Sequence, residues 1–284
     1  MTLLLTFITS SIRLGITFLL GSTGEIITEK SGHLNLGIPG IMCVGAAFMG
    51  LIYSFLTVTL RANQNVTGLA LTTFGVGVTN YIISQLEFVT FQRGSRFFTT
   101  ALPFASKLGW FGQIFLSYGF LVYLGIAIAV AASLVLSKTR VGLHLRAVGE
   151  NPATADAMGI NVTAYRYGAT CVGSAIAGLG GLFFVMDYLG GNWEYCIDAM
   201  GWLSIALVIF TVWKPHMSII GSFLFGGLYI AYNYISGVTF AEKELLKMLP
   251  YVVTILVLIF TSIRNKRENQ PPAGLGLNSY REDR

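Results

Sequence analysis

Charged residues are scarce in this sequence, which excludes an ordinary soluble globular fold. Asp, Glu, Lys and Arg make up 11% of the 284 residues, while 54% are hydrophobic, and soluble domains carry about 25% charged residues. The apolar residues form long runs without the strict alternation of a membrane β-barrel. The sequence therefore predicts an all-α, polytopic transmembrane helical bundle, and its 33 glycines suit close helix packing in lipid.

Residues for catalysis or metal binding are also few. The three cysteines form no metal-spaced pair, and the three histidines lie far apart on different loops. No paired carboxylates and no Ser-His-Asp arrangement can be assembled, and the sequence has no G-x-x-x-x-G-K-[ST] loop for ATP. We therefore expect neither enzyme activity, a cofactor nor a metal site in this chain.

Ionisable residues are nearly absent from the middle of the apolar runs, where Arg13 is the main exception. A carrier driven by protons or sodium usually places titratable or ion-coordinating groups at that depth. Energy for transport would then come from a partner, which favours an ATPase subunit. A secondary carrier that works alone is the alternative from another class.

Eight apolar segments reach or approach the ~20 residues that a membrane-spanning helix needs. They are residues 2–27, 34–60, 66–86, 113–136, 167–189, 199–213, 217–238 and 248–263. The densest Lys and Arg clusters gather on one side when residues 138–166 are placed in the cytoplasm, and both termini then face the cytoplasm. The transmembrane domain is expected over residues 1–263, and residues 264–284 form a cytoplasmic tail.

The polar residues 138–166 contain the start and stop signals of a short helix. Asn151 is a good N-cap, Pro152 suits the first helical position, and Gly159 offers a left-handed stop. The enclosed helix, residues 152–158, exposes small or polar side chains, namely Ala153, Thr154, Ala155, Asp156 and Ala157. Spacing alone supports equally a helix that docks into a groove on another protein and a loop that caps its own bundle or lies on lipid.

A second interruption, SGHLNLGIPG at residues 31–40, breaks an apolar run at membrane depth. Backbone groups freed by Gly37 and Pro39 are tolerated there only inside protein or beside a water-filled cavity. Asn35 would then present an amide to a polar, uncharged ligand, although an ordinary kinked connection is the alternative. The third segment adds further candidates for a translocation path: Thr73, Phe74 and Asn80. We expect Asn80 to be buried, against a partner helix or a wet cavity.

The stretch VGLHLRAVGENPATADAMGI, residues 141–160, closely resembles the cytoplasmic coupling segment of bacterial ABC-importer permeases. The group is the branched-chain amino acid and ribose type, and within it the nucleoside (basic membrane protein) branch. Residues 32–40 resemble the G-x-L-N-L-G-x-x-G signature of the same family, which its fold places at a broken helix beside the pathway. Residues 201–215 and the tail from Pro271 also resemble family segments.

The resemblance implies a permease subunit of an ATP-driven importer in the bacterial cell (inner) membrane. It implies the lipid bilayer and three kinds of protein partner: a second permease subunit that forms a heterodimer with this chain, two ATPase subunits and an extracytoplasmic substrate-binding lipoprotein. It implies no nucleic acid. The coupling helix would insert into a groove on the ATPase through Arg146, Glu150, Asn151, Pro152, Ala153, Asp156, Ala157, Met158 and Gly159. Nucleosides are the expected cargo, with a simple sugar or a flavin-like vitamin as the alternative.

The sequence departs from this branch at two places. Pro39 stands where the branch commonly carries an acidic residue, so a role for an acid there is in doubt. Homologues often have another span between the equivalents of Gly50 and Leu51. Either this bundle is one span smaller or a segment is missing, and a missing span would reverse the sidedness of everything before it.

Overall fold

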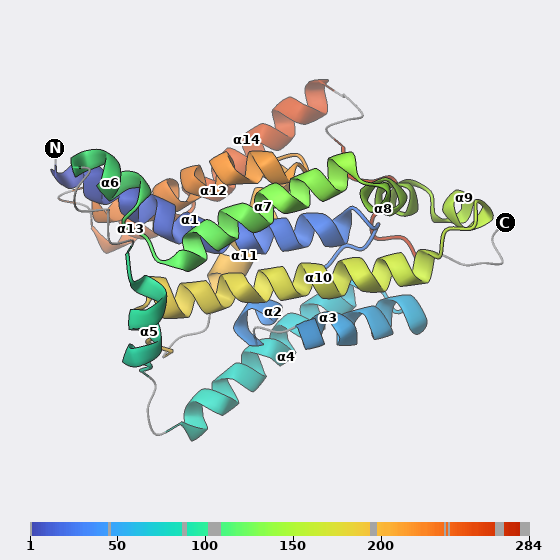
Figure 1. Ribbon diagram of the computed structural model, residues 1–284, viewed down its shortest axis with the longest axis horizontal. Helices are drawn as coiled ribbons and strands as arrows, with labels where there is room; N and C mark the ends of the chain where they lie inside the picture. The colour runs from blue at the N-terminus through green and yellow to red at the C-terminus, as the bar shows by residue number, and fades with distance from the viewer. Residues whose placement is uncertain are drawn as a thin grey trace.

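The computed structural model describes residues 2–44, 47–86, 90–101, 109–193, 198–235, 237, 239–264 and 270–278. Within these ranges the chain is helical, with no β-strand and one isolated bridge between Thr90 and Asn192. The longer helices run roughly along one direction and form an elongated bundle (Figure 1). The prediction of an all-α membrane bundle is confirmed.

Among the described residues, five helical stretches are long and apolar enough to cross a membrane. They are α1 (Thr2–Glu29), α4 (Gln64–Gln85), α7 (Phe120–Lys138), α10 (Val162–Phe183) with its continuation η3 (Phe184–Tyr188), and α13 (Phe240–Lys247) with α14 (Leu249–Arg264). Two shorter helices, α11 (Asp198–Phe210) and α12 (Pro215–Ile230), pack against α1, and the 3-10 turn η4 (Ala231–Asn233) follows α12.

Short helices occupy both ends of the bundle. α5 (Gln92–Thr99) and α6 (Gly109–Phe115) lie at one end, and α8 (Arg140–Glu150) and α9 (Pro152–Ala157) lie at the other (Figure 1). Of these four, the sequence predicted only α9. The end that carries α8 and α9 is called the coupling end below.

The central helix is α1, which packs against α7, α10, α11 and α12. Leu14, Phe18 and Leu19 on this helix are completely buried. The approach to α10 depends on small residues, because a Cβ added to Gly24 would collide with the carbonyl oxygen of Gly173. This is the packing that lipid favours, since van der Waals contact between close backbones replaces the hydrophobic effect as the driving force.

The segment 34–60, predicted as one crossing, is instead a hairpin that returns to its starting end. At its entry, the backbone N–H of Leu34 donates to Oε1 of Gln64 at 2.9 Å. At its exit, the hydroxyl of Thr59 lies 2.5 Å from the hydroxyl of Tyr167. Gln64 is the first residue of α4 and Tyr167 stands in the second turn of α10, and both helices begin at the coupling end. The prediction of a full crossing is therefore wrong.

The two arms of the hairpin are α2 (Ile38–Val44) and α3 (Ala47–Ser54), the latter extended by the π-helix η1 (Phe55–Thr59). Glycines hold both arms against their neighbours. A Cβ on Gly75 of α4 would lie 2.7 Å from the Cα of Gly40, and a Cβ on Gly50 would lie 2.9 Å from the carbonyl oxygen of Thr170. The break at residues 31–40 therefore starts a re-entrant hairpin packed inside protein, which is where irregular backbone is tolerated at membrane depth.

The two ends of the described chain lie at opposite ends of the bundle. α1 starts beside α6 and α13, and it finishes at the coupling end, where residues 270–278 also lie (Figure 1). The sequence predicted both termini on one side, and the described ends lie at opposite ends of the bundle instead. The physical reason is the hairpin, because a segment counted as a crossing contributes none and the direction of α1 reverses.

Candidate coupling helix and translocation face

The short helix α9 is capped as its sequence predicts. Oδ1 of Asn151 accepts a hydrogen bond from the backbone N–H of Thr154 at 3.0 Å, and Pro152 occupies the first turn. Gly159 adopts φ +81°, the left-handed conformation that ends a helix. The helix closes at Ala157, one residue earlier than predicted, and Met158 forms its C-cap.

The outer surface of α9 projects from the bundle (Figure 1). Only Ala155 of this helix is buried, whereas the side chain of Met158 is 78% exposed. A Cβ added to Gly159 would meet nothing within 4 Å. Asn151 and Ala157 are exposed, and Pro152, Ala153 and Asp156 are half-buried. The predicted coupling residues are thus brought together on one small protrusion.

α8 joins this protrusion to α7 and was not predicted as a helix. Thr139 caps its start by accepting from the N–H of Gly142 at 3.2 Å, and its inner face is buried through Gly142, Leu145, Val148 and Gly149. Arg146 and Glu150 are exposed and stand four residues apart, on the same face of the helix. Both therefore flank the start of α9, as a role at the rim of a docking groove requires.

The path candidates on α4 share one exposed face. Thr73, Phe74, Gly77 and Asn80 are all exposed, and their spacing places them along one side of the helix. Asn80 is therefore not buried within this chain, and that expectation is corrected. Its surroundings are set by whatever covers the outer side of α4.

The path candidates in the hairpin do not meet those on α4. The side chain of Asn35 is completely buried, and its Oδ1 accepts from the N–H of Gly37 at 2.9 Å in a local turn. Gly37 and Pro39 are buried as well. These three residues lie behind the packed face of α4, so in this conformation Asn35 presents no exposed amide to a ligand.

A buried polar cluster lies beneath the coupling end, and sequence reasoning missed it. Glu29 accepts a hydrogen bond from Nε1 of Trp213, and Oε1 of Glu25 accepts from the backbone N–H of Asn35 at 3.0 Å. Both acidic residues stand in the last turns of α1, which read simply as the end of an apolar run. These two hydrogen bonds connect α1 to the start of the hairpin and to the turn after α11.

His33 belongs to the same cluster, and its Nδ1 lies 3.2 Å from the hydroxyl of Thr170. The side chain of His33 is completely buried, so this contact holds the turn before the hairpin against α10.

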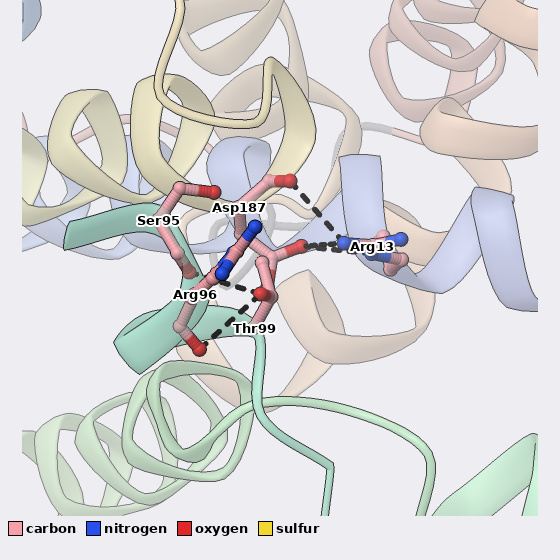
Figure 2. A network of polar contacts seen from close by, with 5 residues as sticks. All are labelled: Arg13, Ser95, Arg96, Thr99 and Asp187. Atoms are coloured by element: carbon pink, nitrogen blue, oxygen red, sulfur yellow. Dashed lines mark hydrogen bonds and ion pairs between the residues drawn. The ribbon is translucent and has the colours of Figure 1, made fainter. Parts of the chain in front are cut away.

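At the opposite end, Arg13 finds a partner that the sequence did not assign. Its guanidinium donates to Oδ1 of Asp187, with Nη2 at 2.7 Å and Nε at 2.8 Å. Figure 2 shows the pair beside α5, where the hydroxyl of Thr99 donates to the carbonyl oxygen of Ser95 in its own helix. Arg13, the ionisable residue in the middle of the first apolar run, is thus neutralised by a structural ion pair between α1 and η3.

These features define a class of protein, a helical membrane transport subunit. It offers a well-capped docking helix at one end and a partly polar helix face at its edge. Residues 40–258 match the family described as the branched-chain amino acid transport system permease component. The match covers most of the chain, and the chain belongs to this family.

Two relatives sharpen the comparison. The chain is 32% identical to the nucleoside ABC transporter permease protein NupC of Lactococcus lactis subsp. cremoris, over 84% of this chain and 86% of NupC. It is 28% identical to the guanosine ABC transporter permease protein NupQ of Bacillus subtilis, with the same coverage of both chains. No solved structure matches the chain.

The alignment with NupC also bears on the span count. It runs over 276 positions while covering 84% of a 284-residue chain. NupC therefore carries residues that have no counterpart here. This agrees with the prediction that relatives hold additional chain.

Proposed function

We propose that this permease is the translocation subunit of an ATP-driven importer of nucleosides in the bacterial cell membrane. Two similar proteins are named as nucleoside and guanosine transporter permeases. The single observation that carries the mechanism is the projecting helix α9, fixed at both ends by Asn151 and by Gly159 at φ +81°. A rigid, smooth and exposed helix of this kind suits insertion into a groove on a partner protein.

In this mechanism α9 seats in an ATPase subunit on the cytoplasmic side. When the two ATPase subunits close on ATP, they move α9. α8 transmits this movement to α7, because α8 directly follows α7 in the chain. Arg146 and Glu150 position the joint through charge-assisted bonds at the groove rim. The permease itself supplies no ATPase site and acts as the gate.

The same orientation assigns the other surfaces. With α9 in the cytoplasm, the start of α1, together with α5 and α6, faces the exterior, where a substrate-binding lipoprotein delivers cargo. The exposed face of α4, with Thr73, Phe74 and Asn80, packs against a second permease subunit and lines the path between them. Residues 270–278 lie on the cytoplasmic side.

Substitutions in α9 test the docking role. Gly159→Pro is incompatible with a positive φ, and Ala157→Trp enlarges an exposed side chain of the projecting helix. Each should lower ATP-dependent uptake of radiolabelled guanosine by roughly 30-fold or more, because central interface residues contribute about 2 kcal/mol or more. Membrane insertion should be unchanged. The matched control is Thr163→Trp, an exposed position in the first turn of α10.

Two further measurements separate the alternatives. Uptake into proteoliposomes that contain the permease without its ATPase subunits would favour a secondary carrier and contradict the proposal. If ribose, glucose or riboflavin competes with guanosine for uptake, the transported substrate is a sugar or a flavin rather than a nucleoside. Normal uptake by Gly159→Pro and Ala157→Trp would reject docking through α9.

A further inference from the structure

Residues 270–278, QPPAGLGLN, cross the coupling end and join three corners of the bundle. We propose that this segment, called the strap below, relays the movement of α9 to the hairpin and to the start of α4. The strap is therefore a positioning element for transport rather than a passive tail. The inference rests on the proposed docking of α9, and its contacts involve residues from five different elements or turns.

The first attachment is the corner between α8 and α9. The backbone N–H of Gly274 donates to the carbonyl oxygen of Gly149 at 2.9 Å, and the N–H of Ala273 donates to Oε2 of Glu150 at 3.4 Å. A Cβ on Gly274 would lie 2.7 Å from the Gly149 oxygen and 3.5 Å from Cδ of Pro152, the first residue of α9. Only glycine fits this approach, so the strap and the base of α9 move together.

The second attachment is the turn that leads from α1 into the hairpin. The N–H of Gly276 donates to the carbonyl oxygen of Gly32 at 3.2 Å, and Nη2 of Arg166 donates to the carbonyl oxygen of Leu277 at 3.4 Å. Gly32 and Gly276 both have positive φ, +85° and +77°. The same turn is in direct contact with Gly149, whose added Cβ would collide with the carbonyl oxygen of Lys30.

The third attachment is the corner between the hairpin and α4. Nδ2 of Asn278 donates to the carbonyl oxygen of Arg61 at 2.7 Å. Arg61 has φ +55°, a left-handed conformation that costs energy for a residue other than glycine. Oδ1 of Asn278 accepts from Nε2 of Gln64 at 3.4 Å, and Gln64 in turn accepts from the N–H of Leu34. One side chain of the strap thus fixes both the exit of the hairpin and the start of α4.

These attachments supply a route from the docking helix to the proposed path. α9 itself packs on α8 and α10, and the start of α4 lies beyond the hairpin. The strap contacts the base of α9 through the backbone of Gly274, at a spacing that admits no side chain, and it contacts the start of α4 through the side chain of Asn278. A displacement of Gly149 therefore pushes directly on Gly274 and, along the strap, on the corner at Arg61. Coupling that travels through packed segments of this kind needs a direct test.

The test uses the complete transporter with its ATPase subunits and binding protein in proteoliposomes. Asn278→Ala removes the third attachment, and Gly274→Val forces apart the first. Leu277→Ser is the matched control, because this side chain is 60% exposed and only its backbone oxygen is used. Each strap variant should assemble and hydrolyse ATP as the wild type does, while guanosine uptake per ATP hydrolysed falls about tenfold, as expected for lost hydrogen bonds in a coupling path.

A second readout needs no substrate. Spin labels at Asn65, in the first turn of α4, and Gly168, in α10, both lie at exposed positions. A non-hydrolysable ATP analogue should change the distance between them in the wild type and in Leu277→Ser. The change should disappear in Asn278→Ala and in Gly274→Val, although the ATPase subunits remain bound.

The outcomes are separable from those for α9. A strap variant that keeps the uptake ratio and the distance change of the wild type overturns the relay. Loss of subunits or of ATP hydrolysis together with uptake also overturns it, because the strap would then be structural only. Failure of the docking proposal shows instead as normal uptake by Gly159→Pro, whatever the strap variants do.

Discussion

α4 and α14 stand at opposite edges of the bundle (Figure 1), and they differ in what they expose. The outward face of α14 is apolar until its last turn, with Val252, Ile255, Leu256, Leu258, Ile259 and Phe260. The outward face of α4 mixes Phe74 with Thr73, Gly77 and Asn80. Both helices leave large surfaces uncovered within this chain, but only one of these surfaces is suited to lipid.

The difference teaches how to interpret exposure in a membrane protein. An apolar helix face is stable in hydrocarbon. An amide there costs free energy, because lipid tails offer it no hydrogen-bond partner. Glycine on an outward face favours close approach by another helix. α14 therefore faces lipid, and the face of α4 is covered by protein or water.

The inward faces support the same distinction. α4 buries Thr67, Gly68, Thr72, Gly75 and Thr79 against the re-entrant hairpin, so polar and small residues occupy its inward face as well as part of its outward face. Among the described side chains of α14, two are buried, Pro250 and Thr254. The hydroxyl of Thr254 donates to the carbonyl oxygen of Pro250 in its own helix. The outward face of α4 also carries large apolar side chains, among them Val66, Leu69 and Tyr81. Small and polar residues on both sides of α4 still favour contact with protein on both sides.

The largest expected effect on uptake comes from placing a tryptophan on the outward face of α4, compared with a tryptophan on the outward face of α14. Gly77→Trp should lower uptake by roughly 100-fold and release the second permease subunit, because the centre of a packed helix interface has no room for a large side chain. Within this chain a Cβ at Gly77 would meet nothing within 4 Å, so the loss must come from outside it. The matched control is Ile259→Trp on α14, where Ile259 is 50% exposed.

Uptake by the complete transporter and co-purification of its subunits provide the measurement. Ile259→Trp should leave both unchanged, since tryptophan is accepted on a lipid-facing surface. Equal losses for the two variants would show that both edges are protein interfaces and would remove the contrast between α4 and α14.

The next effect concerns the amide. Asn80→Leu should lower uptake about tenfold through the loss of a hydrogen bond in a water-poor setting, while membrane insertion improves slightly. The reciprocal change, Leu256→Asn on α14, should reduce the amount of inserted protein, because it places an amide in lipid. Quantitative membrane immunoblots together with transport measurements distinguish the two. Wild-type uptake by Asn80→Leu would place this amide outside the path.

The same contrasts show which features of the structure can be predicted from the sequence. The helix class and the capping of α9 were predictable, because Asn151, Pro152 and Gly159 act through local backbone geometry. Burial was not predictable in the same way. Asn80 was expected inside and is exposed, whereas Asn35 was expected to face a ligand and bonds to its own turn. Composition does not tell which side of a helix meets another subunit.

The predicted topology was wrong at one segment, again because the outcome depends on contacts with distant residues. Residues 34–60 are apolar and long enough to cross, and length was the criterion. Their path depends on contacts from elsewhere, at Gln64 on α4 and Tyr167 on α10, which no local pattern encodes. The strap was missed similarly, because a segment rich in proline and glycine predicts disorder unless its backbone finds partners.

The smallest expected effect on uptake comes from removing a threonine hydroxyl. It gives the strictest comparison, because both α4 and α14 carry a threonine. The hydroxyl of Thr73 donates to the carbonyl oxygen of Leu69 at 3.2 Å, and that of Thr261 on α14 donates to the carbonyl oxygen of Val257 at 2.9 Å. Thr73→Val and Thr261→Val each remove a bond to the carbonyl oxygen four residues earlier, and Thr261→Val also removes one to the carbonyl oxygen of Leu258 at 3.1 Å. A larger loss for Thr73→Val must therefore come from a second partner of the Thr73 hydroxyl, which can also accept a hydrogen bond. We expect uptake to fall about threefold for Thr73→Val, in line with one modest hydrogen bond, and not at all for Thr261→Val, measured as initial rates in the same proteoliposomes. Identical rates for the two would mean that the face of α4 around Thr73 meets no polar group, and the path would then have to lie elsewhere on the bundle.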